Sequence, residues 1–89
     1  MRRLIILGAG GFGQTVADLA RQSGKYSEIC FLDDSKAGSG ILGKISDFAA
    51  FGSEDTEMLP AFGNNQLRLE LARKIESAGI ALATLVHTR

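Results

Sequence analysis

Short apolar runs alternate along the chain with longer stretches whose apolar residues recur at helical spacing. Short, mostly apolar runs bounded by glycine or polar residues favour buried strands. Four such runs are found at Arg3–Leu7, Glu28–Leu32, Glu57–Phe62 and Ile80–Val86. Because Pro60 has no amide hydrogen, we expect its strand to lie at an edge of the sheet or to have an interrupted ladder there.

Two amphipathic stretches between these runs predict helices. In Phe12–Arg21, the side chains of Val16, Leu19 and Ala20 fall on one face. Ser23-Gly24 is a plausible stop for this helix, since glycine adopts the left-handed conformation without strain.

A second helix is predicted to begin at Asn64 or Asn65, either of which would cap it, and to end at Gly79. Its apolar stripe comprises Leu67, Leu71, Ile75 and Ala78. Between the two helical stretches, Ile41–Ile45 is expected to form a short strand and Ser46–Phe51 a helical turn or two.

The order of these elements is strand, helix, strand, irregular segment, strand, helix, strand. Alternation of this kind predicts a parallel sheet with crossover connections and helices on both faces. The 89 residues, 45% of them hydrophobic, suffice for one modest core. We therefore expect residues 1–89 to form a single small Rossmann-like α/β domain with a parallel sheet of about four strands.

Charge and composition narrow the class of partner. Ten basic residues balance ten acidic ones, which argues against nucleic acid and anionic membrane surfaces as main partners. No apolar run approaches the ~20 residues of a membrane span, and the apolar stretch after the basic start is too short for a signal peptide. The single cysteine, Cys30, lies in an expected strand and is interpreted as an inert packing residue. These features favour a cytoplasmic domain.

The stretch after the first strand carries the clearest chemical signal. Gly8, Gly10 and Gly13 match the pattern G-x-G-x-x-G between a predicted strand and a predicted helix. In this context the first glycine permits a tight turn, the second lets a ligand touch backbone and the third lets helix and strand pack closely. The helix N-terminus then offers amide groups to an anion. The alternative is a glycine-rich turn that only packs.

Two adjacent carboxylates follow the second strand. Asp33 lies 20 residues after Gly13 (33 − 13), a position that bonds ribose hydroxyls in Rossmann units. Asp33 and Asp34 are therefore candidate ligand residues, although aspartates are also common in plain turns. Lys36 is either a phosphate contact or a solvated lysine.

A second glycine, Gly63, ends the later strand just before Asn64 and Asn65. If that strand lies beside the first one, two helix N-termini flank one crevice at a topological switch point, which suits a diphosphate. The alternative for the asparagines is capping alone. His87 has no nucleophile, paired carboxylate or second metal ligand at motif spacing, so the sequence predicts a binding module with no catalytic residue and no metal site of its own.

Several of these segments together resemble a known family. GAGGFG, ADLA, FLDDSK, PAFGNNQLRLELARKIESAGI and TLVH are similar to the N-terminal domain of bacterial sugar acetyltransferases. That family includes enzymes that acetylate UDP-linked amino sugars and relatives that O-acetylate sialic acid. The resemblance spans nearly the whole chain, and the combination of motifs is far more specific than the glycine pattern alone.

The resemblance implies a function and a set of binding residues. In the family this domain binds the UDP part of the sugar nucleotide. A following left-handed β-helix forms a homotrimer, binds acetyl-CoA and carries the catalytic histidine. The binding positions carried over are Gly10, Gly11, Phe12, Asp33, Asp34 and Gly63.

Two departures from the family pattern modify the expectation. Phe12 stands where the family often has histidine, so only apolar packing is expected there. The sequence stops at Thr88-Arg89 without hexapeptide repeats. We therefore expect this chain to bind the nucleotide sugar without acetylating it, to need no cofactor of its own, and to be a monomer or weak dimer.

Two other functions stay open at this point. An NAD-binding half-domain of an oxidoreductase is compatible with the glycine loop and Asp33, although a dinucleotide normally uses two such halves. A non-catalytic interaction domain would show an obligate dimer without nucleotide binding.

Overall fold

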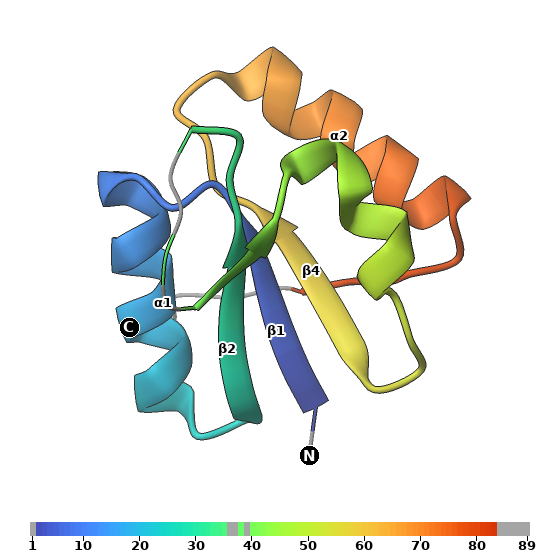
Figure 1. Ribbon diagram of the computed structural model, residues 1–89. Coiled ribbons are helices and arrows are strands. Elements are labelled where there is room, and N and C mark those ends of the chain that lie inside the picture. The colour runs from blue at the N-terminus through green and yellow to red at the C-terminus, as the bar shows by residue number, and fades with distance from the viewer. Residues whose placement is uncertain (1, 36–37, 39, 84–89) are drawn as a thin grey trace.

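The computed structural model describes residues 2–35, 38 and 40–83 of the chain (Figure 1). Its elements alternate between strands and helices in the predicted order. They are β1 (Arg2–Leu7), α1 (Gly11–Ser23), β2 (Tyr26–Leu32), β3 (Ile41–Gly43), the 3₁₀ helix η1 (Ile45–Phe51), β4 (Thr56–Pro60), α2 (Asn65–Ser77) and β5 (Ala81–Leu82). None of the described helices has the length and apolar content to cross a bilayer.

The strands form one sheet in the order β3-β2-β1-β4-β5, and every neighbouring pair is parallel. The central strand β1 therefore lies between β2 and β4. This confirms the Rossmann-like α/β prediction, with five strands rather than about four. The fifth strand is β3, the short strand expected within Ile41–Ile45, and it is only three residues long.

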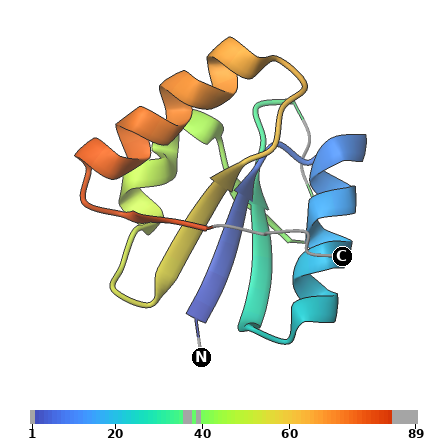
Figure 2. The same ribbon diagram turned by 180° about the vertical axis from the view of Figure 1, so that it is seen from behind.

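Helices cover both faces of the sheet (Figures 1 and 2). Successive residues of a strand point to opposite faces, and Leu4 and Ile6 of β1 pack with α1 while Ile5 and Leu7 pack with α2. All four side chains are fully buried. The apolar run in β1 thus serves two cores at once, which explains why it does not alternate with polar residues.

The stripe predicted for α2 extends beyond the part of the helix that contacts the sheet. Leu71 and Ile75 are buried against β-strand side chains, as expected. Leu67, however, is 42% exposed, and Ala78 is exposed as well. The prediction of a buried stripe is therefore wrong at its first residue, Leu67, and at its last, Ala78, which is the C-cap of α2. Only the middle of the helix packs against the sheet.

The expectation that the Pro60 strand lies at an edge of the sheet is wrong. β4 is internal to the sheet and pairs with both β1 and β5. The carbonyl of Met58 faces β5 and accepts from the amide of Ala83, whereas the amide of Ala61 donates to Leu7 on the β1 side. Pro60, two residues after Met58, directs its nitrogen to the β5 side, beyond the last paired residue, so no hydrogen bond to β1 is lost.

The last described strand, β5, begins at Ala81, one residue after the predicted start. Ile80 precedes β5 and is buried beside Gly52, where an added Cβ would lie 2.6 Å from the Ile80 Cδ1 atom. Residues 84–86 of the predicted strand, as well as Lys36 and His87, lie outside the described residues.

Gly13 marks the closest approach of α1 to the turn after β1. A Cβ added at Gly13 would lie 1.9 Å from the Gly8 carbonyl oxygen, far inside van der Waals contact. The helix can therefore pack on this turn only with glycine at this position, as the third glycine of the pattern predicts.

We expect Gly13→Ala to lower the free energy of unfolding by about 2 kcal/mol or more, because the methyl group forces backbone apart. Gly11→Ala is the matched control, since its Cβ would meet no heavy atom within 4 Å, and its effect should stay within about 0.5 kcal/mol. Urea denaturation of the three proteins measures both effects. Equal stabilities of the two variants would contradict the packing assignment.

The thiol of Cys30 is buried and donates a hydrogen bond to Glu28 Oε2 at 3.4 Å. Burial and, secondarily, the Glu28 carboxylate raise the pKa of the Cys30 thiol, so little reactive thiolate forms near neutral pH. We expect the folded chain to react with a disulfide reagent at least about tenfold more slowly than the chain unfolded in urea. Equal rates in the two states would show that Cys30 is accessible.

Candidate functional site

The carboxyl ends of the neighbouring strands β1 and β4 lie side by side. From there the chain continues into α1 and α2, which cover opposite faces of the sheet (Figure 1). This is the arrangement that the sequence predicted conditionally. Gly8 has a φ of +115°, and a Cβ added to it would lie 3.0 Å from the Ala61 carbonyl oxygen and 3.2 Å from Phe62 Cε1. The two loops therefore touch, and they form a topological switch point, the place where open α/β sheets bind ligands.

Three of the predicted site glycines have open space above them. A Cβ at Gly10, Gly11 or Gly63 would meet no heavy atom within 4 Å, and all three residues are exposed. Neither packing nor positive φ requires glycine at these positions. Glycine there leaves room for another molecule to approach the backbone. The interpretation of the loop as a turn that only packs thus accounts for Gly8 and Gly13 but not for Gly10 and Gly11.

The two helix N-termini differ in how their amide groups are satisfied. At α1, Gly10 is the N-cap with no side-chain cap, and the first turn holds no acidic residue. At α2, the Asn64 side chain accepts a hydrogen bond from the Leu67 amide at 3.0 Å. Amide groups in the first turn of a helix have no intrahelical partner. The terminus of α1 is therefore the better site for an anion, and Asn64 is the cap of α2, whereas the Asn65 side chain accepts from Arg68.

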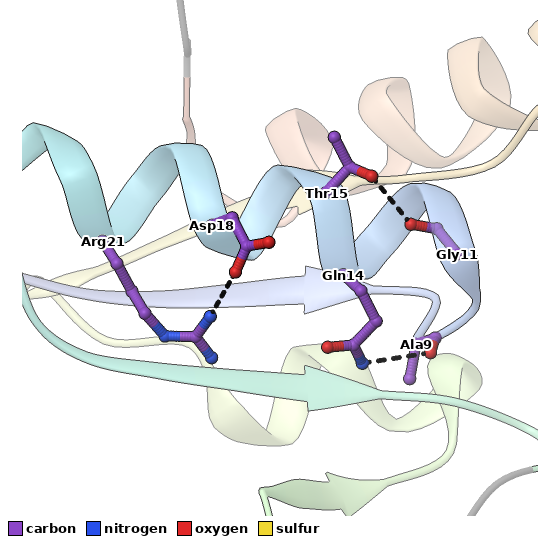
Figure 3. A network of polar contacts seen from close by, with 6 residues as sticks. All are labelled: Ala9, Gly11, Gln14, Thr15, Asp18 and Arg21. Carbon is purple, nitrogen blue, oxygen red and sulfur yellow. Dashed lines mark hydrogen bonds and ion pairs between the residues drawn. The ribbon is translucent and has the colours of Figure 1, made fainter.

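The glycine loop is held by polar contacts at Ala9 and Gly11 (Figure 3). Gln14 Nε2 donates to the Ala9 carbonyl at 3.2 Å, and Thr15 Oγ1 donates to the Gly11 carbonyl at 3.1 Å. At the preceding peptide unit, the Ala9 amide donates to Asp33 Oδ2 at 2.7 Å. Ala9 is thus fixed at both its amide and its carbonyl group, which fixes the course of the loop into α1.

Both predicted carboxylates accept hydrogen bonds from the protein. Asp33 Oδ1 accepts from the amide of Ser35 at 2.8 Å and from its hydroxyl at 3.2 Å. Asp34 Oδ1 accepts from the amide of Ile45, the first residue of η1, at 3.0 Å. The interpretation of these aspartates as turn residues therefore agrees with their hydrogen bonds to Ser35 and Ile45. The bond between Asp33 and Ala9 could not be predicted from the sequence, since 24 residues separate the two.

A hollow of about 300 Å³ adjoins the carboxylates at the end of β2. Its lining adds residues that the sequence analysis did not single out. It is lined by Asp33, Asp34, Ser35, Gly38, Ile41, Gly43 and Lys44. The volume lies at the lower end of the range for small-molecule sites, so it suits a compact group rather than a whole nucleotide sugar. Lys44 directly follows β3, within the segment expected to form a short strand.

The groups brought together here are hydrogen-bond donors and acceptors together with one aromatic ring. Among residues 2–35, 38 and 40–83, no three histidine, cysteine, aspartate or glutamate side chains gather to hold a metal ion. The described site supplies amide donors at α1, carboxylate acceptors at the end of β2 and an exposed aromatic ring, that of Phe12. This combination suits a ligand with an anionic part and a hydroxylated part.

Comparison with known proteins places this arrangement in a family. The sequence profile described as the PglD N-terminal domain matches residues 3–75. The acetyltransferase domain of PglB from Neisseria gonorrhoeae FA1090 has 36% sequence identity with the chain in two solved structures. One of them covers 98% of this chain with a TM-score of 0.91, and the other, in complex with acetyl coenzyme A, covers 97% with a TM-score of 0.89.

A third structure, that of PerB from Caulobacter crescentus with CoA and GDP-perosamine, shares the fold at a TM-score of 0.80, 24% identity and 98% coverage of this chain. This chain spans only 43–45% of the length of the three solved chains. The profile match extends over most of the sequence, including the glycine loop, both aspartates and Gly63. The chain belongs to the family of PglD N-terminal domains, which form the N-terminal part of sugar acetyltransferases.

Proposed function

We propose that this chain binds the UDP part of a nucleotide-linked amino sugar, as the substrate-binding domain of a bacterial sugar acetyltransferase that uses acetyl-CoA. The observation that carries the proposal is the N-terminus of α1, which has no side-chain cap. Its backbone is open to another molecule at Gly10 and Gly11, where an added Cβ would meet no heavy atom within 4 Å.

The diphosphate lies at the glycine loop in this proposal. Amide groups in the first turn of α1 carry partial positive charge and point out of the helix end. The absence of a side chain at Gly10 and Gly11 lets phosphate oxygens come within hydrogen-bonding distance of the backbone. Gly63, at the neighbouring loop after β4, leaves the same clearance on the other side of the crevice.

The nucleoside extends from the diphosphate toward Asp33 and Asp34. Carboxylate oxygens are strong acceptors for ribose hydroxyls or for an N–H of the base. The hollow beside these two residues has a volume that matches a nucleoside rather than the whole ligand. The sugar then lies near Phe12, whose ring is 48% exposed and offers an apolar surface in place of a polar contact.

The acetyl transfer itself is assigned to the part of the solved relatives that this chain does not span. Two of those structures contain acetyl coenzyme A or CoA, which supports acetyl-CoA as the donor in the complete enzyme. We infer a homotrimer for that enzyme, a monomer or weak dimer for this chain alone, and a cytoplasmic location consistent with its balanced charge.

Titration calorimetry with UDP-N-acetylglucosamine, a GDP-sugar and NAD tests the proposal. We expect binding of the UDP-sugar in preference to the other two ligands. Preferential binding of NAD would favour an oxidoreductase half-domain, and preferential binding of the GDP-sugar would retain the site but correct the base. An obligate dimer that binds none of the three would favour a non-catalytic interaction domain.

The variant Gly10→Val tests the position of the diphosphate. Gly10 has φ −75° and ψ −166°, a conformation that valine adopts readily, and its added atoms meet only open space. The variant should therefore fold normally yet weaken UDP-sugar binding about tenfold or more, because its side chain occupies the phosphate position.

Ala81→Val is the matched control, since it places the same side chain at an exposed position of β5, and it should leave the affinity unchanged. Unaltered affinity in folded Gly10→Val would place the ligand elsewhere.

A further inference from the structure

We propose that the two adjacent carboxylates divide their work: Asp33 is a positioning residue that fixes the glycine loop through Ala9, and Asp34 offers its oxygen to the ligand. This inference rests on the proposed function, because it concerns how the same site holds a UDP group. It departs from the simple expectation that both aspartates contact ribose or base.

The Asp33 carboxylate is engaged on both of its oxygens. Oδ2 accepts from the Ala9 amide at 2.7 Å, and Oδ1 accepts from the amide and hydroxyl of Ser35 at 2.8 and 3.2 Å. The Asp33 amide donates to the Gly43 carbonyl at 3.0 Å. Hydrogen bonds from amide groups to a carboxylate are short and strong. Asp33 thus joins the glycine loop to the ends of β2 and β3.

The peptide unit that Asp33 holds lies directly before the amides that would bind the diphosphate. Ala9 is 4% exposed, and the amide of Gly10 belongs to the same peptide unit as the Ala9 carbonyl, which accepts from Gln14. The bond from Asp33 holds the peptide unit that leads directly into the one carrying the Gly10 amide, so loss of this bond would release the backbone from which the amides of Gly10 and Gly11 take their direction. Asp33 acts on the diphosphate by orienting these donors, without contacting it.

Electrostatics supports the same division. A carboxylate and a diphosphate repel each other, and hydrogen bonds from neutral donors to the carboxylate reduce this repulsion by drawing negative charge toward the donors. The three hydrogen bonds from Ala9 and Ser35 serve that purpose. This makes Asp33 poorly suited to be the main acceptor for a ligand hydroxyl.

Asp34 is placed differently. It is exposed, and it lines the hollow at the end of β2. Its Oδ1 atom accepts from the Ile45 amide at 3.0 Å, which orients the side chain, whereas Oδ2 receives no hydrogen bond from the described residues. Asp34 therefore presents one oriented oxygen to a ribose hydroxyl.

A ligand-deletion cycle separates the two roles. The dissociation constants of wild type, Asp33→Asn and Asp34→Asn are measured for UDP and for its 2′,3′-dideoxy analogue. We expect Asp33→Asn to weaken both ligands by the same factor, about tenfold, so that the preference for UDP is kept. Asp34→Asn should weaken UDP by a similar factor and the dideoxy analogue hardly at all, so that the preference is lost. A purely structural effect of either substitution would not remove discrimination against the missing hydroxyls.

A measurement on the unliganded wild-type chain keeps the proposal testable if Asp33→Asn fails to fold. The hydrogen bond predicts a scalar coupling by NMR between the Ala9 amide nitrogen and the Asp33 Cγ. The absence of this coupling would overturn the positioning role. So would loss of the UDP preference in Asp33→Asn, its retention in Asp34→Asn, or unaltered affinity in both variants.

Failure of the proposed function has a different signature. If the wild-type chain bound no UDP while the Ala9–Asp33 coupling was observed, the assignment of the ligand would fall, and the structural tie would remain. If the wild type bound UDP without the coupling, the ligand assignment would stand, and the division between the two aspartates would be wrong.

Discussion

The direct packing of α1 on the turn that follows β1 sets the geometry on which the rest of the molecule depends. At Gly13 the helix backbone approaches the Gly8 carbonyl so closely that an added Cβ would lie 1.9 Å from its oxygen. A larger residue would lift the helix away from the sheet and from the buried side chains of Leu4 and Ile6. The same contact places the first turn of α1 at the carboxyl edge of the sheet, so one packing constraint serves both the core and the candidate site.

A second constraint, the bond between Asp33 and Ala9, links the end of β2 to this turn. Together with the bond from Gln14 to the Ala9 carbonyl, it holds the loop before any ligand is bound. A loop that is already ordered loses less conformational freedom on binding, so more of the interaction energy is retained as affinity. The open space at Gly10 and Gly11 can coexist with a rigid backbone because the rigidity comes from neighbouring residues.

Polar contacts at the amino ends of the strands, opposite the candidate site, stabilise the fold. Arg3 donates to the Phe51 carbonyl at 2.9 Å and to the buried Thr56 hydroxyl, which joins η1, β1 and β4. The Tyr26 hydroxyl donates to Glu57 at 2.7 Å, and Glu57 also pairs with Arg2. Burial and the Glu57 carboxylate raise the pKa of Tyr26, so this link between β2 and β4 stays protonated over the physiological range. These polar side chains have partners within the protein, whereas the α1 N-terminus has no side-chain cap.

The sequence by itself determined the strand and helix order and the roles of Gly8 and Gly13, because local spacing and glycine conformation carry that information. The family followed from the resemblance of its motifs to those of known proteins. It also singled out both aspartates as candidate ligand residues, and the structure places them beside the hollow at the end of β2. Only the tertiary structure decided that β4 is internal, that the Leu67 side chain of α2 is exposed, and that Asn64 rather than Asn65 caps this helix. The same holds for the contact of Asp33 with Ala9 and for the hollow beside Lys44. These features join residues far apart in the chain, and neither periodicity nor composition encodes which distant groups the sheet brings together.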